Sequence, residues 1–503
     1  MKRALEKTAL MVLICAALFL VPTLSTSGRS TQIALNAEAQ QLATTQQMTL
    51  PITRETTMVI DEDAHPRYAT HPQQNFGILR LGDRTHVAYM DSHLRILIRT
   101  FDHKRGDWTG PSTLLGIGDQ EQHYPNMAID KEGFIHVIWG GHGGPTPLRY
   151  RMSLRPNDCS DWRIAEEPVA DLSAAYPKII VDRANYTYLF YRVSPPRSTF
   201  PEGPWSIAYV RKRLGSATWE PPVSLVTDNQ ENMPNSVSVQ MIGSRLGIIW
   251  IWNNRTDTSL RNNRNISIAF RNEAGWSKTD GTPYSLPISF RTAEHVYSGF
   301  VYRAGSLVQQ QSRPLIFFNT VEPLQLVLAR YHNGSWIYLT FPNLYIGQFG
   351  VDTVGRVHGV VTEKNMTGLA YMCARPDLSL WELGGVYALI NSGPVRYPIV
   401  APQLTDYLEA AWPQGGRLVY FRATPRVITA TSTASVGFIT TSFTPRKDSC
   451  TDSIRRRRAP RESLPPMISV GGAILFGVSA SNRLYARSLE RSLACIPSCD
   501  KVA

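Results

Sequence analysis

The feature that most constrains the fold of this chain is a tryptophan that returns at nearly regular intervals. Each copy ends a short polar turn and follows segments in which apolar and polar residues alternate, the pattern of antiparallel strands. The intervals are 54, 57, 57, 60 and 45 residues, between Trp108, Trp162, Trp219, Trp276, Trp336 and Trp381. Repeats of this length built from four short strands are typical of β-propeller blades. A β-sandwich, the alternative all-β architecture, would not explain the spaced tryptophans.

The repeats predict one large all-β domain. A second strand reads FIHVIWG at 134–140, and its counterparts read YTYLFYR at 186–192, LGIIWIW at 246–252 and LEAAWP at 408–413. Counting such units from residue 75 to about 424 gives seven. We therefore expect a seven-bladed β-propeller of four-stranded antiparallel blades over residues 57–424. An N-terminal strand near 57–60 is a candidate to complete the last blade.

The two ends of the chain differ from the repeats. The N-terminus begins MKRALEK and continues into an apolar run, as secretory signals do. We expect a signal peptide at 1–28 and a secreted or extracytoplasmic protein, with an uncleaved signal anchor as the alternative. A flexible leader is expected at 29–56 and a basic, partly disordered tail at 425–503. No stable membrane span is expected after signal removal.

Charge and cysteine usage exclude two classes of protein. The formal net charge is +12, but the tail from residue 425 holds 12 Lys and Arg against 5 Asp and Glu, which is +7 of that total. Since most of the basicity lies outside the repeats and no nucleic-acid-binding module is recognisable, nucleic acid is not an expected partner. Of the six cysteines one lies in the signal and three in the tail, so a disulfide framework is not expected to hold the fold.

Four residues beside predicted strand ends could carry chemistry at a propeller mouth. His123 and Tyr176 lie at the beginnings of first strands, and His142 and Arg192 at the ends of second strands. A histidine can take or give a proton near neutral pH, and a tyrosine can do so when a cation lies beside it. An arginine can hold a carboxylate with two parallel hydrogen bonds. Proton abstraction beside a carboxylate, followed by loss of a leaving group, needs only these roles and no cofactor.

Three further residues are candidates for binding substrate. Asn126 follows the Tyr124-Pro125 pair at the beginning of a first strand. Arg149 and Arg151 alternate with a tyrosine on one predicted strand, so they share a face that could bind an acidic sugar. Paired surface cations with no ligand are the alternative reading of these two arginines.

The central segment resembles a known family. HYPNMAIDKEGFIHVIWGGHGGPTPLRYRMS at 123–153 is similar to the BNR-repeat (sialidase-like) propellers that include the ulvan lyases. The resemblance implies that Tyr176 and His123 share proton abstraction and donation while His142 and Arg192 bind and neutralise a uronate. Related lyases often carry an acidic residue directly before the first histidine, where this chain has Gln122. A structural zinc or calcium ion is possible in such propellers, but no ligands are identifiable, and no metal is assigned to the site.

The resemblance implies a secreted polysaccharide lyase that cleaves an ulvan-like, uronic-acid-containing polysaccharide by β-elimination. The expected partner is therefore an acidic polysaccharide, and the protein is expected to be a monomer. Two alternatives stay open. One is a non-catalytic carbohydrate-binding propeller that uses the same residues without turnover. The other is a glycoside hydrolase or a relative that cleaves rhamnose-glucuronate linkages.

Overall fold

The protein is described by a computed structural model over residues 52–71, 74–142, 147–166, 169–170, 173–194, 204–229, 231–254, 262–364, 366, 368–378, 381–386 and 394–425. The expected signal, tail and most of the leader lie outside these residues. The described end of the leader is a strand, because β1 begins at Ile52 rather than at residue 57. The described residues contain no α-helix, hence none long and apolar enough to cross a membrane.

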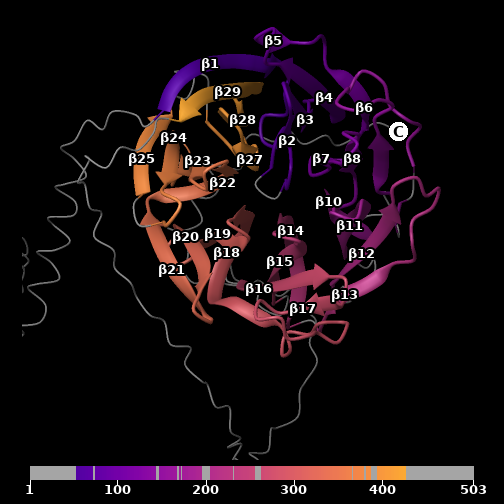
Figure 1. Ribbon diagram of the computed structural model, residues 1–503, viewed down its shortest axis with the longest axis vertical. Coiled ribbons are helices and arrows are strands. Elements are labelled where there is room, and N and C mark those ends of the chain that lie inside the picture. The colour runs from indigo at the N-terminus through magenta and orange to yellow at the C-terminus, as the bar shows by residue number, and fades with distance from the viewer. Residues whose placement is uncertain are drawn as a thin grey trace, which may run out of the picture. The chain divides into compact units, whose positions relative to one another are not determined.

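The strands form antiparallel groups that follow one another around a ring, as in a propeller (Figure 1). The first three groups contain β2 (Ile78–Leu81), β3 (Arg84–Met90), β4 (Arg95–Asp102), β5 (Asp107–Trp108) and β6 (Thr113–Ile117); β7 (Asn126–Ile129), β8 (Ile135–Trp139) and β9 (Arg149–Met152); and β10 (Ala174–Val181), β11 (Tyr186–Val193), β12 (Ser206–Arg213) and β13 (Val223–Thr227). The group β7–β9 has three strands rather than the four expected. Isolated bridges at Glu166 and Trp162 lie beside its third strand.

The second half of the ring continues the same order. One sheet joins β14 (Met233–Ile242), β15 (Arg245–Asn253), β16 (Asn263–Asn272) and β17 (Gly275–Ser277) to β18 (Glu294–Gln310), β19 (Arg313–Thr320), β20 (Gln325–His332) and β21 (Ser335–Pro342), since β16 pairs with β18. The next holds β22 (Leu344–Asp352), β23 (Val357–Glu363), β24 (Leu369–Ala374) and β25 (Trp381–Val386), with β27 (Gln403–Leu404) parallel to β22.

The last sheet closes the ring with both ends of the described chain. It contains β26 (Ile399–Val400), β28 (Leu408–Gln414) and β29 (Arg417–Pro425), and β1 (Ile52–Asp61) pairs antiparallel with β29. The prediction that an N-terminal strand completes the last blade is therefore confirmed. The second strands predicted from the repeat are also confirmed, as β8, β11, β15 and β28.

The hydrophobic core lies between neighbouring sheets. Tyr188 and Phe190 of β11 belong to the same buried cluster as Trp250 and Trp252 of β15. The recurring tryptophans pack at sheet edges, as Trp276 does against Phe190, with ring centroids 6.1 Å apart. Aromatic side chains bury large areas, so a tryptophan at one position of each repeat supplies the contact between blades.

Four consecutive first strands carry a β-bulge. Register shifts occur between Ala175 and Lys178 in β10 and between Asn235 and Val237 in β14. Others lie between Arg303 and Ser306 in β18 and, in β22, between Leu344 and Gly347. A bulge adds an unpaired residue and re-aims its side chain, and bulges are frequent beside active sites.

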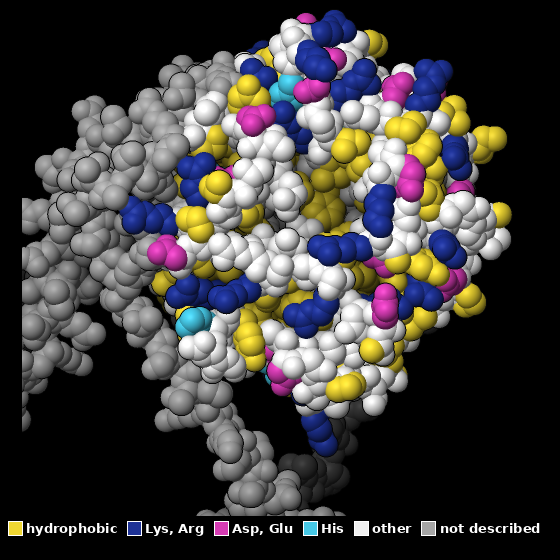
Figure 2. Space-filling view, viewed as in Figure 1, with side chains coloured by type: hydrophobic (Ala, Val, Ile, Leu, Met, Phe, Trp, Pro, Cys, Tyr) yellow, Lys and Arg dark blue, Asp and Glu magenta, His cyan; other side chains and the backbone are white. Residues whose placement is uncertain are grey.

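The centre of the ring is filled by the segment before β2. Asn75 exchanges side-chain hydrogen bonds with the backbone of Val239 in β14, and Gln74 donates to the carbonyls of Ala88 and Pro125. Gln348 of β22 donates in turn to the Gln74 carbonyl. These bonds leave a cavity of about 20 Å³, room for about one water molecule. Figure 2 shows one face hollowed near the middle of the ring, with Lys and Arg side chains around the hollow.

Candidate functional site

Tyr176 lies at the bulge of β10, held in an unusual backbone conformation. Its φ is +53°, a region that non-glycine residues seldom adopt. Its amide N–H donates to the carbonyl of Gly141, 3.1 Å away. A Cβ at Gly141 would lie 2.3 Å from the Ala174 carbonyl, so only glycine lets this loop approach β10 so closely. The Tyr176-Pro177 pair is thus inside β10 at a bulge, not at its first residue as expected.

His142 follows Gly141 and is in direct contact with Tyr176. Its Nε2 lies 2.5 Å from the Tyr176 hydroxyl, and its Nδ1 lies 2.9 Å from Oε1 of Gln120. With the amide oxygen as acceptor, Nδ1 carries the ring proton and Nε2 is left to accept from the tyrosine. Oε1 of Gln122 lies 3.1 Å from the same hydroxyl. Two of the four predicted site residues are therefore in contact, with two glutamines beside them, although the sequence paired Tyr176 with His123 rather than with His142.

Arg192 of β11 lies across the ring of Tyr176. Its guanidinium carbon is 4.6 Å from the centroid of that ring and 3.9 Å from the centroid of Trp205. Its Nε donates a hydrogen bond to Ser194 Oγ, and its Nη1 donates one to Asn235 Oδ1; each donor–acceptor distance is 2.8 Å. The arginine is thus fixed between two aromatic rings, and a positive charge lies over the ring of the tyrosine that would become a phenolate.

Lys178 lies beneath the bulge and is fully buried. Its Nζ is 3.2 Å from the Pro177 carbonyl, 3.4 Å from the Tyr176 carbonyl and 5.4 Å from the centroid of the Tyr124 ring. Burial lowers the pKa of Lys178 to about 7. An ammonium group without a carboxylate partner is costly to bury. The lysine is therefore expected to be present for its contacts with the two carbonyls of the bulge.

His123 differs from its expected role. Its side chain is fully buried rather than facing a ligand, and its Nδ1 accepts the backbone N–H of Asp119 at 3.0 Å. Burial lowers the pKa of His123 to about 4, so the ring is neutral near pH 7. Within the described ranges it makes no hydrogen bond with Tyr176, and its Nε2 has no partner. The residue that reaches Tyr176 from this loop is its neighbour, Gln122.

The three residues expected to bind substrate have different surroundings. Asn126 is fully buried, donates to the Pro177 carbonyl at 3.0 Å and accepts the backbone N–H of Asn75 at 2.7 Å. Its amide therefore supports the Tyr176 bulge from behind. Arg149 lies 3.6 Å from Asp119 and donates to a backbone carbonyl. Nε of Arg151 is buried without a hydrogen-bond partner among the described residues.

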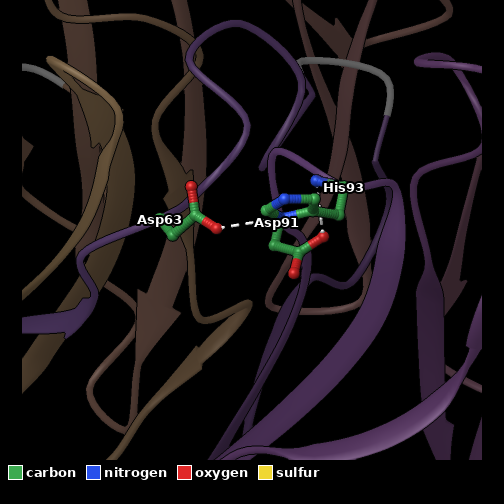
Figure 3. A group of neighbouring side chains, drawn as sticks. All are labelled: Asp63, Asp91 and His93. Atoms are coloured by element: carbon green, nitrogen blue, oxygen red, sulfur yellow. Dashed lines mark hydrogen bonds and ion pairs between the residues drawn. The ribbon is translucent and has the colours of Figure 1, made fainter.

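One group of side chains in the described part of the chain has the spacing of a metal site. The ligand atoms of Asp63, Asp91 and His93 lie within 4.8 Å of one another (Figure 3). The Asp91 carboxylate already accepts two backbone N–H groups of its own turn and pairs with Arg95, and Nδ1 of His93 lies 3.0 Å from Asp63. These contacts are those of a capped turn, and we assign no metal to it.

Sequence reasoning missed the residues that orient the site. Gln120, Gln122, Asn235 and Lys178 lie in different loops and strands, and no sequence pattern joins them. The sequence distinguishes Gln122 only as a departure from the acidic residue that related lyases carry at this position. Because the Tyr176–His142 pair can move a proton and Arg192 can hold an anion, the assembled site has the groups that proton abstraction beside a carboxylate requires.

Comparison with known proteins places this geometry in context. The model of the BNR repeat-containing family matches residues 84–322. A PL25 ulvan lyase of Pseudoalteromonas sp. (strain PLSV) is 24% identical over 308 residues, 50% of this chain and 60% of that protein. An ulvan lyase of Alteromonas sp. (strain LOR) is 25% identical over 166 residues, 28% of this chain and 32% of that protein. The chain thus spans less than two thirds of the length of each of these relatives.

Solved structures show the same fold. A PL25 ulvan lyase bound to -[GlcA(1-4)Rha3S]- superposes with a TM-score of 0.56 and 17% identity, over 73% of this chain and 95% of that one. A second structure of a PL25 ulvan lyase gives a TM-score of 0.57. Residues 84–322 therefore match the BNR repeat-containing family model, and the chain is similar in sequence and fold to ulvan lyases.

Proposed function

We propose that this protein is a secreted polysaccharide lyase that cleaves an ulvan-like, uronic-acid-containing polysaccharide by β-elimination. The observation that carries the proposal is the contact of Tyr176 with His142, 2.5 Å apart, beside the guanidinium of Arg192. The similarity to ulvan lyases supports the polysaccharide lyase class. We also propose seven blades, because the strands fall into seven successive groups when β14–β17 and β18–β21 are counted apart. A monomer is proposed as well, as the sequence analysis expects.

The reaction can be written for these side chains. His142 Nε2 accepts the Tyr176 proton, and the resulting phenolate takes the C5 proton of the uronate. Arg192 holds the carboxylate and stabilises the negative charge that develops on it. The electron pair then forms the C4–C5 double bond while the bond from C4 to the glycosidic oxygen breaks. Tyr176 returns the proton to that oxygen, so the products are an unsaturated uronate and a free hydroxyl.

The first test compares Tyr176→Phe with the wild-type protein on ulvan. We expect kcat, followed through the ultraviolet absorbance of the unsaturated uronate, to fall by about 10²–10⁴-fold with little change in KM, because general acid–base catalysis contributes about that factor. Tyr331→Phe is the matched control, since that ring packs on Trp336 at the outer side of its sheet.

Two other outcomes separate the alternatives. Wild-type protein that binds ulvan and releases no product would identify a carbohydrate-binding propeller. New reducing ends without an unsaturated product would identify a hydrolase. Either result contradicts β-elimination.

A further inference from the structure

A second arginine lies beside a bulge in a first strand of the ring. Arg303 of β18 pairs with Asn319 of β19, and the register shifts on both sides of that pair. Tyr176 differs, because it lies unpaired inside the bulge of β10, between Ala175 and Lys178. The residues after Arg303 in β18, Gly305 and Ser306, line the small cavity at the centre of the ring, so Arg303 lies near that centre.

The guanidinium of Arg303 is held in one orientation. Its Nη1 lies 3.0 Å from Nε2 of His71, and its guanidinium carbon lies 5.2 Å and 5.8 Å from the ring centroids of Tyr302 and Tyr397. His71 is itself buried and stacks on Tyr124, with centroids 4.2 Å apart. Burial holds the pKa of His71 well below its usual value, so the ring is neutral and its Nε2 accepts from the arginine.

This oriented cation has no counterion. Among the described residues Arg303 forms no ion pair, whereas Arg95 and Arg356 each pair with an aspartate. The other arginine near His71 is Arg67, which differs from Arg303 because it is exposed. Its guanidinium carbon lies 4.9 Å from the centroid of the Tyr68 ring. A pre-oriented guanidinium without a carboxylate partner is the usual form of an anion-binding group.

The surroundings of Arg303 and those of the Tyr176 bulge meet at Tyr124. His71, which contacts Arg303, stacks on the Tyr124 ring, and Nζ of Lys178, beneath the bulge, lies 5.4 Å from the centroid of the same ring. The hydroxyl of Tyr124 is buried, and within the described ranges it has no hydrogen-bond partner. Burial raises the pKa of Tyr124 well above its usual value, while Arg303 and Arg192 each act to lower it. Both guanidinium groups therefore act electrostatically on the same side chain, although they come from β18 and β11.

We propose that Arg303, oriented by His71, is a second anion-binding subsite that takes the charged group of a sugar next to the uronate held by Arg192. The group is a sulfate ester or a second carboxylate, because a guanidinium binds either with paired hydrogen bonds. The inference rests on the proposed function, and it makes the protein selective for chains with anionic groups on neighbouring sugars.

The test uses Arg303→Gln on three substrates. Native ulvan carries sulfate esters, chemically desulfated ulvan keeps only its uronate carboxylates, and alginate has a carboxylate on every sugar. We expect KM for native ulvan to rise on the order of 10- to 100-fold, the range for a lost hydrogen bond to a charged group. kcat/KM for desulfated ulvan should stay within about twofold. A matching loss on alginate would assign the subsite to carboxylates as well as sulfates.

Controls separate this subsite from the rest of the proposal. Arg313→Gln removes an exposed arginine from the far end of the β18–β19 hairpin and should leave all three substrates unchanged. An equal loss on native and desulfated ulvan would overturn the subsite. If wild-type protein proves inactive, the proposed function fails, and calorimetric binding of the two ulvans to wild type and Arg303→Gln still decides the subsite: equal affinities overturn it.

Discussion

At the scale of single residues, the buried amine of Lys178 explains how Tyr176 keeps its strained conformation. Its Nζ lies within hydrogen-bond reach of the carbonyls on either side of the Tyr176-Pro177 bond, and Asn126 binds one of them from the neighbouring sheet. A left-handed conformation at a non-glycine residue persists only when its surroundings enforce it. We therefore regard Lys178 as a positioning residue for the reacting hydroxyl.

Replacing Lys178 by Met should lower kcat by about tenfold and leave KM nearly unchanged, because the substrate site stays intact while the hydroxyl is misplaced. The pKa of the amine is about 7 in the folded protein and 10.5 in the unfolded chain. Between these values the unfolded chain binds more protons, so this lysine makes the free energy of unfolding increase as pH rises. Urea denaturation from pH 7 to 10 should show a smaller increase for the variant.

Lys104→Met is the control, because Lys104 is exposed and pairs with Asp83. Parallel pH curves for wild type and Lys178→Met would contradict the assignment of the low pKa to this amine.

At the scale of strands, two groups share a buried Asp–His–Tyr contact. His358 of β23 lies 2.8 Å from the Tyr371 hydroxyl and 3.0 Å from Oδ2 of Asp352. The corresponding contacts of His136 are 2.7 Å to Tyr150 and 3.1 Å to Asp130. In both cases the aspartate lies six residues before the histidine, across a turn that contains glycine. This repeated contact ties a turn to the third strand of its own sheet.

Asp352→Ala should destabilise the protein by about 3–5 kcal/mol, the usual cost of removing one partner of a buried pair. Burial alone would raise the pKa of Asp352, but hydrogen bonds from His358 and Arg356 lower it to about 2. Its contribution to stability is therefore complete above the unfolded value of 3.8 and is lost as pH falls towards 2. Denaturation of wild type and variant at pH 7 and pH 2.5 measures it.

The difference between wild type and Asp352→Ala should shrink at the lower pH. A difference that stays constant would show that the carboxylate charge is not what stabilises the turn.

The elements were largely predictable from sequence, and the site only in part. Alternating strands and spaced tryptophans follow from local patterns, and these gave the propeller and the second strands. The sequence predicts that the strand ends carrying His142 and Tyr176 converge, but it pairs Tyr176 with His123, and the contact of His142 with Tyr176 comes from the structure. The supporting role of Asn126 depends on the segment that fills the ring, because Asn126 binds Asn75, and a repeat pattern contains no information about a segment that does not repeat. The burial of His123 depends on its own loop, where it binds Asp119.

At the scale of the whole molecule, Glu409 joins the last sheet to the first. The Glu409 carboxylate is buried. It accepts hydrogen bonds from the hydroxyl groups of Thr85 and Tyr420, each 2.6 Å long, and it lies 3.3 Å from Nε2 of His103. Thr85 belongs to β3, and Glu409 and Tyr420 belong to β28 and β29. This contact therefore lies at the junction where the ring closes.

Glu409→Gln should lower the free energy of unfolding by about 1–3 kcal/mol, since it weakens charge-assisted bonds in a buried network. Thermal unfolding followed by circular dichroism measures the change. Glu62→Gln is the control, because Glu62 is an exposed partner of Arg417 in the same sheet. Equal effects of the two substitutions on the free energy of unfolding would contradict the prediction that Glu409 stabilises the closure of the ring.

The pairing of β1 with β29 also imposes an order in time. β1 is synthesised before any other described strand, and its partner is the last of them. During synthesis the first strand must therefore wait, unpaired, while the other sheets form behind it. A chain that terminates early, before Arg417, never supplies the partner. Such a product keeps an open strand edge that can pair with other chains, so premature termination converts this fold into a species prone to aggregate.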